Sequence, residues 1–87
     1  MAAYRIVFSK RAHNDLKKLS PAVQKRMRAK LEFFLDSAAP VQSATALTKP
    51  ADAQYRWGVG SYRVLFDQLP DGTIAVVKIQ HRKEVYR

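Results

Sequence analysis

Three arginines and a tyrosine in the second half of the chain are the residues best suited to do chemistry together. Arg56 and Arg63 lie in two consecutive strand-like segments, and Arg82 follows a third. If these segments form an antiparallel meander, the chain reversals bring the three guanidinium groups to one face and rim of a sheet. Planar guanidinium groups donate bidentate hydrogen bonds, so such a cluster could clamp a phosphate group. The same rim would gather His81, Lys83, Tyr86 and Arg87.

Three of these residues also have a simpler explanation. Arg56 could be a cross-strand partner on a solvated sheet face, Arg82 a surface charge and Tyr86 a packed terminal aromatic. Tyr55 and Trp57 could stack on nucleic-acid bases, or could equally lie in the core or under a partner protein. Charge and spacing alone therefore favour anion binding over catalysis.

The first half of the chain is predicted to form one strand and two helices. Apolar and polar residues alternate over residues 3–9, which indicates a strand. Ser9 is a suitable N-cap for a first helix, and Ser20 followed by Pro21 suits the start of a second helix that ends near residue 37. The two-residue break predicts a helical hairpin packed on a sheet.

The second half is predicted to form a surface loop and three strands. Residues 41–52 have weak periodicity, and we expect a loop there. Strands are expected over residues 54–59, 62–68 and 74–80, separated by turn sequences. The fold class is therefore α+β: an N-terminal strand, a two-helix hairpin and a three-stranded antiparallel meander, packed as one sheet with the helices on one face. Residues 1–87 form a single domain.

The composition narrows the chemistry and the partners. Sixteen lysines and arginines face seven aspartates and glutamates, for a formal net charge of +9. Such an excess favours polyanions: nucleic acid, an anionic membrane surface or an acidic protein. The absence of cysteine excludes disulfides and thiol catalysis. No apolar run approaches the roughly 20 residues of a membrane span, so we expect a cytoplasmic protein.

Two segments resemble the RelE/ParE toxin superfamily in particular. They are the strand Gly60-Ser61-Tyr62-Arg63 and the ending in which His81-Arg82 is followed, three residues later, by Tyr86. Either motif alone is weak, but the pair is quite specific. The resemblance extends over nearly the whole chain, including residues 4–8, Ala12, residues 15–19 and residues 55–56.

The resemblance implies a toxin of a type II toxin–antitoxin pair, a metal-independent endoribonuclease that cleaves mRNA in the ribosomal A site. Its implied partners are a cognate antitoxin, the ribosome and mRNA, and no membrane association is expected. The implied reaction uses no cofactor or metal. Arg63 and Arg82 would stabilise negative charge and Tyr86 would be the general base, while His81 is a weaker acid–base candidate. The expected RNA contacts are Arg56, His81, Lys83, Arg87, Lys17, Lys18, Lys25 and Arg26.

Gly58 departs from the family pattern. Members of the RelE type often carry a second basic residue at this point, two positions after Arg56. A glycine supplies no cation, so either activity is reduced or another residue compensates. Lys78 and Lys83 are the candidates, depending on the direction in which they point.

The sequence is also compatible with two other functions. Members of the ParE type poison DNA gyrase and need no RNA-cutting site. A plain nucleic-acid-binding module would also explain 16 basic residues.

Overall fold

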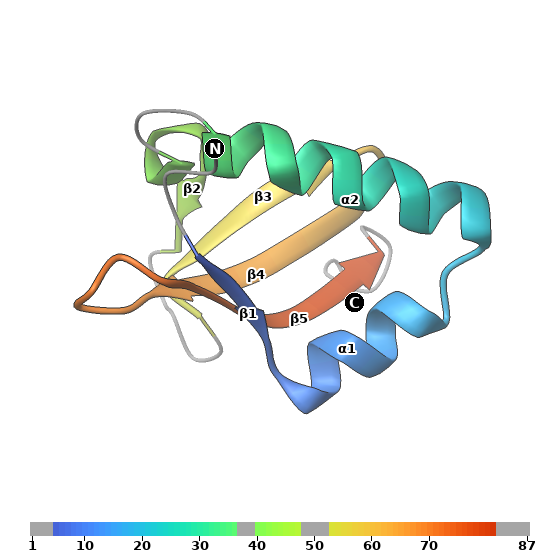
Figure 1. Cartoon of the computed structure of the whole chain (residues 1–87), viewed down its shortest axis with the longest axis horizontal. Helices are drawn as coiled ribbons and strands as arrows, with labels where there is room; N and C mark the ends of the chain where they lie inside the picture. Colours follow the sequence, from blue (N-terminus) through green and yellow to red (C-terminus); the bar gives the residue numbers. More distant parts are fainter. Residues whose placement is uncertain (1–4, 37–39, 48–52, 82–87) are drawn as a thin grey trace.

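The computed structural model describes residues 5–36, 40–47 and 53–81, and these form one mixed five-stranded sheet with two helices (Figure 1). The strand order is β1-β5-β4-β3-β2, with β1 parallel to β5 and the other pairs antiparallel. The predicted α+β class, the meander and the added N-terminal strand are confirmed. The elements are β1 (Ile6–Phe8), α1 (Lys10–Lys17), α2 (Pro21–Asp36), the 3₁₀ turn η1 (Pro40–Ser43), β2 (Thr45–Ala46), β3 (Tyr55–Val59), β4 (Tyr62–Gln68) and β5 (Ile74–His81).

Both helices begin at the serines that the sequence marks as caps. The Ser9 hydroxyl accepts a hydrogen bond from the Ala12 N–H at 3.0 Å. The Ser20 hydroxyl accepts one from the Val23 N–H at 3.3 Å. Each serine satisfies a backbone donor that has no partner within the helix, which fixes where the helix starts.

The core lies between the helices and one face of the sheet. Trp57 is fully buried, and its ring stacks on Phe66 at 3.9 Å and on Phe34 of α2 at 4.7 Å between ring centroids. Met27 and Ile74 are equally inaccessible. Trp57 is therefore a core residue, and of the two alternatives for this ring, stacking on RNA bases is ruled out. Tyr55 is half-buried and packs on Phe66 at 5.5 Å.

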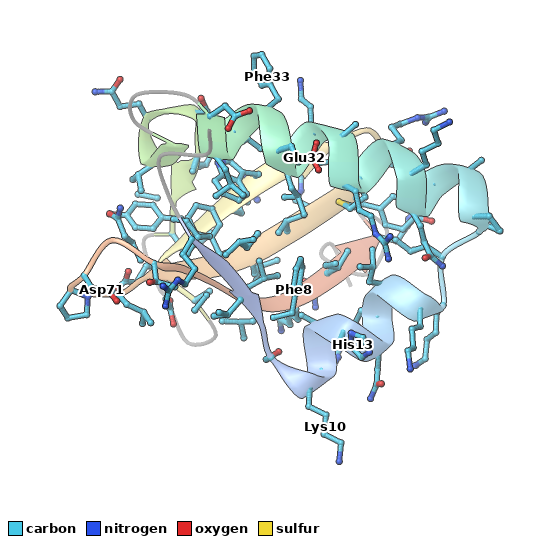
Figure 2. The ribbon with its side chains drawn as sticks, in the orientation of Figure 1. Phe8, Lys10, His13, Glu32, Phe33 and Asp71 are labelled. Atoms are coloured by element: carbon cyan, nitrogen blue, oxygen red, sulfur yellow. The ribbon has the colours of Figure 1, made fainter. Side chains whose placement is uncertain are left out.

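The two helices diverge from their connection (Figure 1). A groove lies between them and is lined by residues of α1, α2 and β1. The groove has a volume of about 320 Å³ and a largely apolar lining. Phe8 of β1, 37% exposed, lies in the space between the helices (Figure 2). The other lining residues are Ile6, His13, Leu16, Arg28, Leu31, Glu32 and Leu35.

Helix α1 protects the part of β5 that β1 does not cover. Strand β1 pairs with residues 74–76 of β5 and no further. Beyond them, Asp15 accepts a hydrogen bond from the Ile79 backbone N–H at 3.1 Å and an ion-pair contact from Arg11 at 3.2 Å. Asp15 thus satisfies a partly buried edge donor that would otherwise be costly.

The turn between β4 and β5 is fixed by Asp71 and Gly72. The Thr73 N–H donates to the Asp71 carboxylate at 2.9 Å, and hydrogen bonding to Thr73 holds the pKa of Asp71 below its usual value. Gly72 has φ +92°, a conformation that other residues rarely adopt. The predicted turn between the last two strands is therefore confirmed.

The structure adds three details to the predicted elements. Strand β1 is shorter than the predicted 3–9, of which residues 3 and 4 lie outside the described residues. The predicted loop contains η1 and the two-residue strand β2. The last strand extends one residue further than predicted, to His81. No helix in the described part of the chain is long and apolar enough to cross a membrane.

Candidate nucleic-acid interface

Arg56, Arg63 and Lys78 share the sheet face that points away from the helices. In the antiparallel register Leu65 of β4 lies opposite both Arg56 and Lys78, and Arg63 lies two residues before it. Cross-strand partners direct their side chains to the same face, so the three cations surround Leu65. All three are half-buried, and Leu65 is 8% exposed. The expected proximity of Arg56 and Arg63 on one hairpin is confirmed.

Gly58 lies beneath the guanidinium group of Arg63. The two residues are direct cross-strand partners, and a Cβ atom placed on Gly58 would lie 3.7 Å from Arg63 Nη1. The Nε atom of Arg63 is buried. The guanidinium therefore lies across β3 at the position from which a longer residue at 58 would project.

Lys78, one of the two lysines considered as a substitute for the cation missing at Gly58, lies on the same sheet face as Arg63. It lies diagonally from Arg63, because its direct partner is Leu65 and that of Arg63 is Gln80. Lys78 thus adds a cation to this face on β5, with β4 between it and Gly58. Lys83, the other candidate, lies outside the described residues.

His81 lies at the same end of the sheet as Arg63 but on the helix-covered face. It is the cross-strand partner of Tyr62, and the two rings are perpendicular with centroids 5.1 Å apart. Both residues are half-buried. Hence His81 and Arg63 lie on opposite faces of the same end of the sheet.

Arg82, Tyr86 and Arg87 also lie outside the described residues, so their predicted roles remain predictions. The described chain ends at His81, opposite the first residue of β4. Arg82 follows His81 directly in sequence, and Arg63 follows Tyr62.

Sequence comparison decides the family. Residues 6–86 match the model of the ParE toxin of type II toxin–antitoxin systems (parDE). The chain belongs to this toxin family, within the RelE/ParE superfamily. No curated protein sequence is similar enough to count as a match.

Solved structures of RelE toxins have the same fold as this ParE-family toxin. A mutant of Escherichia coli toxin RelE in the free state is 27% identical, with a TM-score of 0.72, covering 99% of this chain and 92% of that one. RelE in the RelB–RelE complex of Methanococcus jannaschii is 26% identical, with a TM-score of 0.70 and coverage of 92% and 94%. The RelBE2 complex of Mycobacterium tuberculosis, at 24% identity, a TM-score of 0.74 and coverage of 91% and 98%, supports the fold alone.

The basic residues predicted to contact RNA from the region of the two helices are all exposed, and three of them line different hollows. Lys18 and Arg26 line hollows beside Tyr62 and His81. Lys25 lies in a separate depression on α2 with Arg28 and Glu32. Lys17 is exposed at the end of α1. Their contact with RNA stays a prediction.

Tyr62 is a residue of this sheet end to which the sequence analysis gave no role. It belongs to the Gly-x-Tyr-Arg motif but was assigned only to a strand. Its partnership with His81 depends on a β-bulge between the two strands, where Leu65 pairs with Lys78 but Phe66 pairs with Val76. The bulge shifts the alternation of the end of β5, so that Ile79 and His81 face the helices.

Proposed function

We propose that this toxin is a ribosome-dependent mRNA endoribonuclease that inhibits translation. The observation that carries the proposal is the Arg63 guanidinium, held across Gly58 on a sheet face that it shares with Arg56 and Lys78. Cations fixed in position before the reaction stabilise developing negative charge better than mobile ones, because they need no reorganisation.

The reaction proposed is attack of an RNA 2′-hydroxyl on the adjacent phosphate. A general base takes the 2′-hydroxyl proton, the new P–O bond forms, the bond to the 5′-oxygen breaks, and that oxygen receives a proton. Arg63 and Arg82 stabilise the extra charge on the phosphate, and Tyr86 is the base. His81 is a weaker candidate for acid–base work.

The proposed protein partner is a cognate antitoxin with an acidic amphipathic helix. Its acidic side suits a toxin of net charge +9, and its apolar side suits the groove that contains Phe8 and Leu16. Solved relatives are RelB–RelE complexes, in which a toxin of this fold is bound to its antitoxin.

A gyrase poison is the second candidate, because the matching family is described as the ParE toxin. One experiment separates the two. Purified toxin is added to a translation extract and, in parallel, to DNA gyrase with supercoiled plasmid, and mRNA ends are mapped by primer extension. We expect new mRNA ends that disappear when translation initiation is blocked. Gyrase-dependent DNA breaks with intact mRNA would instead establish the gyrase poison.

A further inference from the structure

The perpendicular Tyr62–His81 ring pair separates two hollows on the helix side of the sheet end. The hollow toward α2 has a volume of about 230 Å³ and is lined by Val23, Arg26, Met27, Val59, Gly60 and Ser61. The hollow toward α1, about 350 Å³, is lined by Arg11, Asp15, Lys18, Leu19 and Ile79. Tyr62 and His81 line both, so the hollows meet at the two rings.

The charge around the rings is mainly positive. Among the described residues that line the two hollows, Asp15 is the one acid, and it is engaged by Arg11 at 3.2 Å and by the Ile79 N–H at 3.1 Å. Lys18, the C-cap of α1, lines one hollow and Arg26 of α2 lines the other, and both are exposed. An anion that enters either hollow therefore meets a cation whose charge the site does not itself offset.

Aromatic faces between two cations suit a nucleotide. Bases stack on aromatic side chains with little regard to sequence, and lysine and arginine hold the phosphates on either side. An acidic peptide would use the cations but would gain little from the exposed parts of two rings. A nucleotide uses both features.

We propose that Tyr62, His81, Lys18 and Arg26 form a binding site for one nucleotide of single-stranded RNA. The inference rests on the proposed function, because it assigns a further contact to the same RNA substrate. Tyr62 precedes Arg63 in the sequence and His81 precedes Arg82, so the nucleotide site adjoins two residues of the proposed catalytic site. The nucleotide bound here flanks the one that is cut, and the RNA strand passes around the end of the sheet from one face to the other.

The test measures binding of a fluorescent hexa-adenylate to the purified chain by anisotropy, without ribosomes, over a range of salt concentrations. Tyr62→Leu keeps an apolar side chain against the core but removes the ring, and Tyr62→Phe keeps the ring. We expect Tyr62→Leu to weaken binding roughly tenfold and Tyr62→Phe to bind as the wild type does. Equal affinity for all three proteins overturns the site.

The charge contribution is tested at exposed positions, where substitution does not threaten folding. We expect Arg26→Ala and Lys18→Ala each to weaken binding and to reduce the slope of log affinity against log salt by about 0.7. Lys10→Ala is the matched control, since Lys10 projects away from the molecule at the other end of α1 (Figure 2). If Lys10→Ala changes the slope as much as Arg26→Ala does, binding is diffuse and the site is refuted. If Tyr62→Leu does not fold, the salt dependence of the Arg26, Lys18 and Lys10 variants tests the site by itself.

Failure of this inference and failure of the proposed function give different results. If the wild type cuts mRNA while the Tyr62 and Arg26 variants bind RNA normally, the nuclease stands and the nucleotide site falls. If the variants lose RNA affinity but the wild type cuts nothing, the site stands and the nuclease falls. An acidic antitoxin peptide that occupies the hollows without being displaced by hexa-adenylate would assign them to the antitoxin and overturn the site.

Discussion

The contact between Gly58 and Arg63 allows the proposed role of Arg63 to be tested at the scale of single residues. The 3.7 Å separation between Arg63 Nη1 and a Cβ placed on Gly58 is an ordinary van der Waals contact, so alanine fits there. We expect Gly58→Ala to cleave ribosome-bound mRNA within a few-fold of the wild-type rate. Gly58→Asp places a carboxylate against the guanidinium and neutralises it, and we expect a loss of at least about tenfold. Equal rates for the two variants would contradict the proposed role of Arg63.

The sequence predicted the sheet-face arginines but not the arrangement of the last strand. Arg56 and Arg63 share a face because each strand alternates and a two-residue turn joins them, and both properties are local. The side on which His81 lies depends on the bulge in the β4–β5 pairing. Without the bulge, regular alternation would continue from Ile74 and Val76 along the strand. Lys78 and Gln80 would then face the helices, and Ile79 and His81 would face away from them. A one-residue irregularity of this kind has no clear sequence signal.

Asp15 connects helix α1 to the sheet at the scale of elements. Its removal leaves the partly buried Ile79 N–H unsatisfied, so we expect Asp15→Ala to lower the free energy of unfolding by about 1–3 kcal/mol. Arg11→Ala removes only the exposed partner of the same carboxylate and should cost less than about 1 kcal/mol. Urea denaturation of both variants checks this. Similar losses for the two would mean that the hydrogen bond to β5 contributes little.

The β4–β5 turn gives a pH-dependent contribution to stability. Hydrogen bonds from Thr73 lower the pKa of Asp71 in the folded state, so the ionised carboxylate stabilises the fold above the unfolded pKa of about 3.9. This contribution is lost as the pH falls through the folded pKa. We expect Asp71→Asn to be slightly less stable than the wild type at pH 7, and the difference to shrink below about pH 4. Thermal unfolding curves at both pH values measure it, and a difference that does not change with pH would refute it.

The predictable elements are those with local signals. Ser9 and Ser20 marked both helix starts, and the turn sequences marked the meander. The choice of β5 as the parallel neighbour of β1 joins residues such as Ile6 and Ile74, and a pairing of such long range has no local signal. The same holds for β2, whose two residues pair only with the start of β3.

At the scale of the whole molecule, the groove between the helices determines where we expect the antitoxin to bind. Val7 and Phe8 are adjacent and similarly exposed, at 43% and 37%, but Phe8 lines the groove and Val7 does not. We therefore expect Phe8→Ser to weaken antitoxin binding at least tenfold, and Val7→Ser to leave it nearly unchanged. Calorimetric titration of each variant with the co-encoded antitoxin measures the difference. A stronger effect of Val7→Ser would place the antitoxin elsewhere.

Cleavage of mRNA on the ribosome by the wild type and by Arg63→Ala is the most direct test of the central claim. Both proteins are added to the same stalled ribosome–mRNA complex, and the rate of appearance of cut mRNA is measured under single-turnover conditions. We predict ribosome-dependent cuts by the wild type and a rate at least about a hundredfold lower for Arg63→Ala, with antitoxin binding retained. Equal rates for the two proteins, or no cut by the wild type, would contradict the account.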